Sequence, residues 1–333
     1  MSLYLYCLRE PSGTPPENCS APRVARGELS VTCHALSVIK SQGVNGKDGV
    51  TIRAFDGIEA VVSEVNFDDF GEMQKKAQED IHWIKEKALA HEMVIEEAMG
   101  LSANDSIDRN AKATAGPEAF ALPQTVDRRP STVDCQKATA SSPCRLNPSP
   151  VIPVKFGVIF NNEERLAKVI SEQSAAIRAA FDRIRAKQEW SVKLFLKDNQ
   201  KIKDQVMEQS ELFREKSKTL AALPAGMAYF MEEEFNEELE RECSRRLDEE
   251  AMETFEELKP FAAEATLVKI LDSKLTGRSE RMILNSAYLV ANNHLPEFKN
   301  AVAKLREKLA PGGFLVEQSG PWPPYHFTEF ANE

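Results

Sequence analysis

Between residues 151 and 318 the apolar residues change their spacing several times, and this order restricts the fold more than any other feature of the chain. The stretch VIPVKFGVIF at 151–160 has the length and composition of a strand, and a helical pattern starting at NNEERL follows it. Next come a strand at 190–196, a helical region at 199–260, two strands, a helix and a last strand. If the region 199–260 is an insertion, the other elements suggest the βαββαβ order of a ferredoxin-like domain.

The region 199–260 predicts two antiparallel helices. Helical patterns run from about Asn199 to Leu220 and from about Met227 to Leu258, and the stretch LPAG separates them. In the second pattern one apolar residue recurs every four positions, which places these side chains on one face. They are Phe235, Leu239, Cys243, Leu247, Ala251 and Phe255. We therefore expect a helical hairpin inserted into the C-terminal domain.

The first hundred residues predict a smaller α+β domain. SLYLYCLR has the composition of a strand, and Asp56-Gly57 between two alternating stretches is a strong hairpin signal. A helical stripe that starts at Met73 continues to Gly100, which can end a helix.

Residues 101–150 differ in composition from both flanks. They have no sustained apolar period and are rich in Ala, Ser, Thr, Pro and Asp, which is typical of a disordered or loosely packed insertion. The chain is therefore expected to be α+β with two domains, 1–100 and 151–318, separated by this insertion and followed by a C-terminal tail at 319–333.

Charge and composition exclude several classes of partner. The chain has 42 Lys and Arg against 52 Asp and Glu, a net charge of −10, which argues against nucleic acid or a lipid membrane as a partner. No apolar run approaches the roughly 20 residues of a membrane span, and the N-terminus lacks a secretion signal, so we expect a cytoplasmic protein. Six cysteines without a Cys-x-x-Cys motif are typical of reduced thiols.

No motif in the chain predicts a catalytic, metal or cofactor site. There is no glycine-rich phosphate loop. His82 and His91 lie nine residues apart on a predicted helix, which puts them on opposite faces, so they cannot share a metal. Cys33 and His34 are neighbours that would point to opposite sides of a strand, so they do not form a dyad.

Two further stretches have a structural and a functional interpretation. The acidic run MEEEFNEELERE is typical of a solvated helix face, but it could supply a carboxylate pair or a patch for a basic partner. A ferredoxin-like sheet can bind single-stranded RNA through exposed aromatic residues, but Trp190 in WSVKLFLK fits the buried face. These features favour a binding or scaffolding protein over an enzyme.

Six stretches, from the first strand to the tail, have counterparts in a known family. They are LYLYCL, HEMVIEEAM, VIPVKFGVIF with NNEERL, WSVKLFLKD, ILNSAYLV and SGPWPPYHF. Their order resembles that of the gas vesicle protein GvpL/GvpF family over nearly the whole chain, apart from about Leu101 to Pro150. The resemblance implies two α+β domains, the second a modified ferredoxin-like domain with helical additions, and no enzymatic residues or cofactor.

The resemblance also implies a role in gas vesicle assembly, in the cytoplasm and at the vesicle. Its implied partners are the small hydrophobic shell protein GvpA and other accessory proteins. A shell subunit must expose apolar surface before it assembles, and a partner could cover that surface while its own acidic surface keeps the complex soluble. The alternative is a small-molecule-binding or catalytic ferredoxin-like protein that uses Cys33, His34 or the acidic helix.

The tail SGPWPPYHFTEF is unusually aromatic for a chain end. Its prolines restrict the backbone and cannot donate hydrogen bonds, so the stretch is not an interior strand. The rings are expected either to pack onto the protein's own sheet and hold the last strand, or to form part of a surface that grips the shell protein. The candidate residues are Trp322, Pro323, Pro324, Tyr325 and Phe327.

Overall fold

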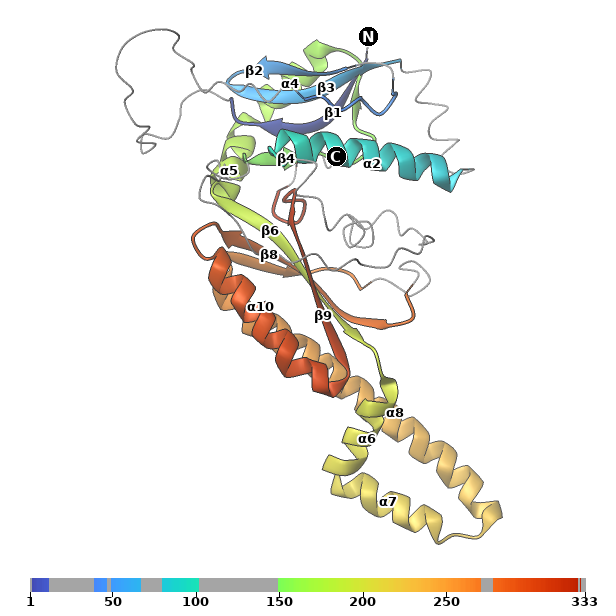
Figure 1. The fold of residues 1–333 in the computed structure, drawn as a ribbon. Coiled ribbons are helices and arrows are strands. Elements are labelled where there is room, and N and C mark those ends of the chain that lie inside the picture. The colour runs from blue at the N-terminus through green and yellow to red at the C-terminus, as the bar shows by residue number, and fades with distance from the viewer. Residues whose placement is uncertain are drawn as a thin grey trace, which may run out of the picture. The chain divides into compact units, whose positions relative to one another are not determined.

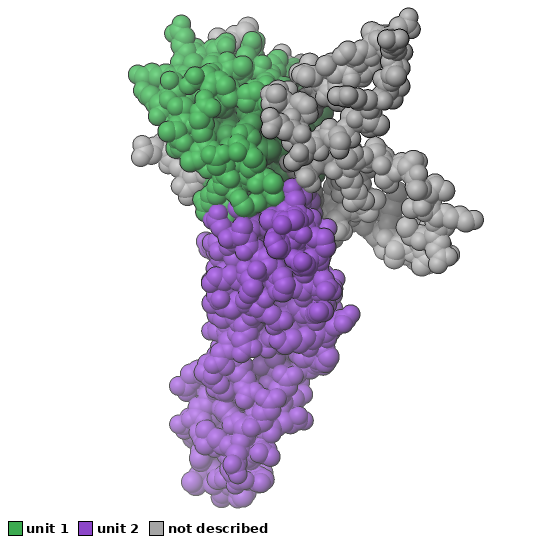
Figure 2. All heavy atoms as spheres, turned by 90° about the vertical axis from the view of Figure 1, so that its left-hand side faces the viewer, with its two compact units in different colours: residues 1–107, 136–187, 323–333 green, residues 108–135, 188–322 purple. Residues whose placement is uncertain are grey.

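The computed structural model describes residues 2–11, 39–46, 49–66, 80–101, 149–270, 278–328 and 330. These residues form two compact units, which Figure 2 distinguishes by colour. Unit 1 contains the described residues up to Leu101, those from Ser149 to Lys187 and those from Pro323 onward, and unit 2 contains those from Gln188 to Trp322. Each unit combines an antiparallel sheet with helices, which confirms the α+β class.

The sheet of unit 1 is built around its first strand. Its strands are β1 (Ser2–Arg9), β2 (Val50–Phe55), β3 (Ile58–Val65), β4 (Val151–Pro153) and β5 (Ile159–Phe160). The order is β2-β3-β1-β4, and β5 also pairs with β1 (Figure 1). Asp56 and Gly57 between β2 and β3 have φ angles of 47° and 73°, the left-handed conformation that a tight hairpin turn needs. The predicted hairpin is therefore confirmed.

β4 and β5 belong to unit 1, whereas the sequence analysis placed residues 151–160 at the start of the second domain. Cys7 and Leu8 of β1 lie opposite Pro153 and Ile152 of β4. The reason is that β1 is buried along its whole length, so the backbone groups on both of its edges need partners. β3 supplies the partners for one edge of β1, and the apolar stretch after residue 150 supplies those for the other edge.

The helix α2 (Ile81–Ala98) packs on this sheet and begins at a capped end. The carboxylate of Asp80 accepts hydrogen bonds from the first backbone N–H groups of the helix, as an N-cap does. The start of the predicted stripe, at Met73, lies outside the described residues. Beyond the helix, the N–H of Ser149 donates to the carbonyl of Met99 at 2.9 Å. The chain therefore returns at residue 149 next to the place where it leaves α2.

Two shorter helices complete unit 1. They are α4 (Glu163–Glu172) and α5 (Ser174–Ile184), where the sequence predicted one helix start at NNEERL. The side chain of Asn162 accepts a hydrogen bond from the N–H of Arg165 at 2.8 Å and so caps α4 as predicted.

Unit 2 has a four-stranded sheet. Its strands are β6 (Lys187–Leu196), β7 (Glu264–Leu267), β8 (Arg281–Ala291) and β9 (Phe314–Trp322). They lie in the order β7-β8-β6-β9, and the β7–β8 and β6–β9 pairs are antiparallel. Its helices are α6 (Asn199–Gln209), α7 (Glu211–Ala221), α8 (Ala225–Leu258) and α10 (Leu295–Leu309), with short 3-10 turns at Lys259–Phe261 and Ala310–Gly312.

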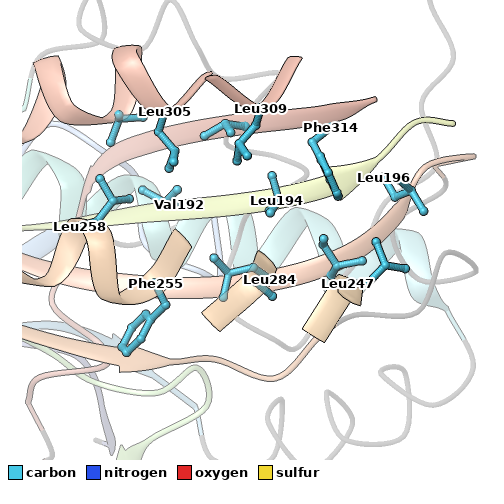
Figure 3. Close-up of a cluster of buried hydrophobic side chains, with 14 of the residues drawn as sticks. Val192, Leu194, Leu196, Leu247, Phe255, Leu258, Leu284, Leu305, Leu309 and Phe314 are labelled. Carbon is cyan, nitrogen blue, oxygen red and sulfur yellow. The ribbon is translucent and has the colours of Figure 1, made fainter. Parts of the chain in front are cut away.

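The core of unit 2 lies between its sheet and the helices α8 and α10. Figure 3 shows Val192 and Leu194 of β6 facing Leu305 and Leu309 of α10, with Leu258 of α8 beside them. The α8 residues of the predicted four-residue stripe from Leu239 to Phe255 are buried in the same core. This part of α8 therefore contributes to the core of unit 2.

Candidate functional site

The two histidines of the predicted helix have different environments. His82 is exposed, whereas His91 is buried in unit 1. Nε2 of His91 lies 3.0 Å from the carbonyl oxygen of Val154, which can only accept, so Nε2 carries the proton. Nδ1 then accepts a hydrogen bond from the hydroxyl of Tyr4 at 3.0 Å. Burial lowers the pKa of His91 to about 4, so the ring is neutral near pH 7.

The hydroxyls around His91 are also engaged. The N–H of Gly157 donates to the hydroxyl of Tyr4 at 3.0 Å, and the N–H of Val44 donates to the hydroxyl of Tyr6 at 2.9 Å. The hydroxyl of Tyr6 also lies 2.9 Å from the side-chain oxygen of Ser63. Burial raises the pKa of both tyrosines. These bonds connect β1 to β3, α2 and the 154–157 segment, which is a structural role.

The described cysteines are poor nucleophiles. Cys7 and Cys243 are buried free thiols. Burial raises the pKa of Cys7 to about 12 and also raises that of Cys243, so both stay protonated near pH 7. The candidate pair Cys33 and His34 lies outside the described residues.

The acidic run of α8 is a surface in which several carboxylates are already paired. Glu242 accepts hydrogen bonds from Arg245 at 2.7 Å and from Arg246 at 3.2 Å. The bond from Arg245 lowers the pKa of Glu242 to about 2, far below the value that a general acid needs at neutral pH. Arg245 also pairs with Glu249 on the next turn. Within the described part of the chain, no three acidic, histidine or cysteine side chains are placed to hold a metal ion.

Trp190 does not offer a ring for stacking nucleic acid bases. It is buried in the core of unit 2, as the alternation of WSVKLFLK predicts. Its indole N–H donates to the side chain of Gln188 at 3.3 Å, and the ammonium of Lys299 lies 4.4 Å from the ring centroid. Among the described helices, none is long and apolar enough to cross a lipid bilayer.

Trp322 is the only one of the five tail candidates that belongs to unit 2. It ends β9, lies opposite Glu189 of β6 and is buried. Its indole N–H donates to the side-chain oxygen of Ser319 at 3.1 Å. This ring therefore lies against the last strand.

The other tail candidates lie in unit 1. Pro323, Pro324 and Phe327 are buried, and Tyr325 packs against the core next to β1. The hydroxyl of Tyr325 donates to the carboxyl group of Glu92 on α2 at 2.9 Å. Burial and this neighbouring carboxyl raise the pKa of Tyr325. Sequence reasoning did not identify the partner on α2, because residues far apart in the chain meet here.

Sequence reasoning also missed the largest exposed apolar cluster among the residues that the structure describes. Four large apolar residues within five positions at the start of α8 are exposed, and we call them the hairpin tip. They are Met227, Tyr229, Phe230 and Met231, with exposed fractions of 61%, 67%, 73% and 42%. The sequence could have indicated these exposed residues, because GMAYFM is an unbroken apolar run that cannot lie on one face of a helix. The predicted stripe was followed only from Phe235 onward.

The comparisons with known proteins agree on one family. The model of the family described as gas vesicle synthesis protein GvpL/GvpF matches residues 2–104 and 144–329. The residues between the two matched ranges, 105–143, fall inside the insertion expected from the sequence. The chain is 22% identical over 295 residues to gas vesicle protein L of Streptomyces sp. (strain CB03234), covering 88% of each protein.

Two solved structures have a similar fold. The crystal structure of GvpF from Anabaena sp. PCC7120 matches with a TM-score of 0.60 at 17% identity, covering 99% of both chains. That of GvpF from Microcystis aeruginosa matches with a TM-score of 0.54 at 15% identity and the same coverage. Because the family model matches both units and most of the sequence between its first and last strands, the chain belongs to the gas vesicle synthesis protein GvpL/GvpF family.

Proposed function

We propose that this protein is a non-enzymatic accessory factor of gas vesicle assembly that acts in the cytoplasm. In this proposal it binds the hydrophobic shell protein GvpA, together with other accessory proteins, and keeps GvpA from aggregating before it enters the growing vesicle. Membership of the family supports a gas vesicle role. The observation that carries the proposal further is the exposed hairpin tip on a chain with a net charge of −10.

These two properties together suit a factor that holds an aggregation-prone client. Soluble proteins rarely leave several large apolar side chains exposed next to one another unless they bind something there. Net charge far from zero keeps a protein, and a complex that it dominates, dispersed in water. A protein with both can cover the apolar surface of a client without precipitating with it.

The absence of enzymatic activity is part of the proposal. It is supported by the chemistry of the titratable groups described above: His91 is neutral and inaccessible, and Cys7 is protonated. The carboxylate of Glu242 is held by two arginines. The alternative is a catalytic or small-molecule-binding protein that uses Cys33, His34 or the acidic helix, and Cys33 and His34 lie outside the described residues.

We also infer that unit 2 is a modified ferredoxin-like domain that begins at β6. Along the chain its elements follow the order β6, helices, β7, β8, α10, β9, and the sheet order is β7-β8-β6-β9. Both features agree with the ferredoxin-like arrangement, in which each helical connection joins two strands that follow each other in sequence but are not neighbours in the sheet. For the tail we propose a packing role, supported by the burial of Trp322, Pro323, Pro324 and Phe327.

Co-expression tests the proposed function. GvpA is expressed in a host without gas vesicle genes, either with this protein or with an acidic protein of unrelated fold, and the fraction of GvpA that stays in the supernatant after centrifugation is measured. We expect this protein, and not the control, to raise that fraction and to elute with GvpA in size-exclusion chromatography. If GvpA sediments equally in both cases, the proposal is wrong.

A further inference from the structure

We infer that the hairpin tip is a docking surface for a partner helix that is apolar on one face and bordered by lysine or arginine. The inference rests on the proposed function, because it names the surface and the chemistry by which a client is held. It comes from the residues that surround the hairpin tip and from their exposure, as follows.

Packing within the hairpin accounts for only part of the hairpin tip. Phe235 marks the face of α8 that turns toward α7, since its ring meets that of Phe213 edge to face with centroids 5.7 Å apart. At about 100° per residue, Phe230 points roughly 140° away from Phe235 and Tyr229 roughly 120° away in the other direction. Both rings are therefore turned away from α7 and lie in solvent, against each other, with centroids 5.7 Å apart. A helix end that is apolar all round is typical of a buried helix.

The composition of the hairpin tip suits a helical partner. Two methionines flank the two rings, and methionine is unbranched and flexible enough to adapt to different apolar surfaces. Surfaces of this kind take up the apolar face of an amphipathic helix. Leu212 on α7 is as exposed but lies singly, and single exposed apolar residues are ordinary on a protein surface. Leu89 and Met93 on α2 form an exposed pair without an aromatic ring, with exposed fractions of 62% and 40%.

The charge around the hairpin tip indicates the sign of the partner's charge. Glu232, Glu233 and Glu234 follow it directly and are exposed. Residues 211–240 contain eight glutamates and three basic residues, a net charge of −5. Two of the three basic residues are already paired, Lys216 with Glu238 and Lys218 with Glu215. An acidic border attracts a cationic partner and repels a second copy of the same hairpin.

A peptide titration tests the inference. The probe is a fluorescent synthetic amphipathic helix made of leucine and lysine, and its counterpart replaces lysine with glutamate. Each is titrated with the full-length protein, and binding is followed by fluorescence anisotropy. The test variant carries Tyr229→Ser and Phe230→Ser. Leu212→Ser, at a residue that is 60% exposed on the same hairpin, is the matched control.

We expect the leucine–lysine helix to bind and the leucine–glutamate helix not to bind. The double serine variant should bind at least about tenfold more weakly, because exposed rings of this kind carry much of the affinity at an interface. The Leu212→Ser variant should bind as the wild type does. Replacing Glu232, Glu233 and Glu234 with Gln should weaken binding and reduce its dependence on salt. Circular dichroism melts should show that all variants keep their fold.

Three results would overturn the inference: equal binding by the double serine variant, equal binding of both peptides, or a dimer of the wild type that the double variant does not form. The last would mean that the occupant is a second copy. Co-expression of the same variants with GvpA separates this inference from the proposed function. If the double variant keeps GvpA soluble as the wild type does, the hairpin tip is not the client surface and the proposed function stands.

Discussion

Removing the tail should destabilise unit 1 and leave unit 2 intact. The perturbation is a truncation after Trp322, which keeps the ring that lies in unit 2 and deletes those that lie in unit 1. Phe327 and Phe330 are only 3% and 5% exposed, and burying each ring is worth about 2–3 kcal/mol. The hydrogen bond from Tyr325 to Glu92 adds about 1 kcal/mol. The loss of about 5–7 kcal/mol is comparable with the whole stability of many domains, about 5–15 kcal/mol.

Amide hydrogen exchange followed by mass spectrometry can locate this loss. Exchange in β1 and α2 should become much faster in the truncated protein, whereas exchange in β6 and β8 should stay close to that of the full chain. A truncation after Phe330 is the matched control and should resemble the full chain. Slower or unchanged exchange in β1, or a matching loss of protection in β6, would refute the reasoning that the tail stabilises unit 1.

Two further predictions concern one residue in each unit. Because burial lowers the pKa of His91 from 6.5 to about 4, its contribution to the stability of unit 1 is fully present above about pH 6.5 and falls by about 3 kcal/mol as the pH drops to 4. Urea unfolding across this range should show that slope, and His91→Gln should flatten it; an equal slope in the variant would contradict the assignment. In unit 2, Leu247→Ala should cost about 2–5 kcal/mol because Leu247 is buried in the core, whereas the exposed Leu212→Ala should change stability by less than about 0.5 kcal/mol. Equal effects of the two changes in urea unfolding would be evidence against the packing described for α8.

Local features of the fold were accessible from the sequence, because they depend on neighbouring residues. The turn at Asp56-Gly57 needs two residues that tolerate positive φ, and the sequence supplies them at that point. The cap at Asn162 and the buried stripe of α8 follow from the same kind of short-range rule.

Features that depend on pairing between distant segments were not accessible. An apolar strand such as Val151–Pro153 can complete any sheet edge, and only the buried length of β1 decides which edge it joins. The hydrogen bond from Tyr325 to Glu92 on α2 also joins distant segments, so the sequence did not predict it. The hairpin tip was missed for another reason. Helical periodicity predicts which face of a helix packs within the chain, but it does not predict which apolar residues outside that face are exposed.

The hydrogen bond from Ser149 to Met99 has a practical consequence for engineering. It holds the described residues on either side of the stretch 102–148 together, so unit 1 itself fixes the distance that any segment inserted there has to span. The entropy of closing a loop rises only slowly with its length, by about 0.6 kcal/mol for each doubling. A reporter domain whose own termini lie close together can therefore be grafted between residues 101 and 149. Such a graft would let the protein be followed by fluorescence in cells while the hairpin tip and the C-terminal end stay free of tags.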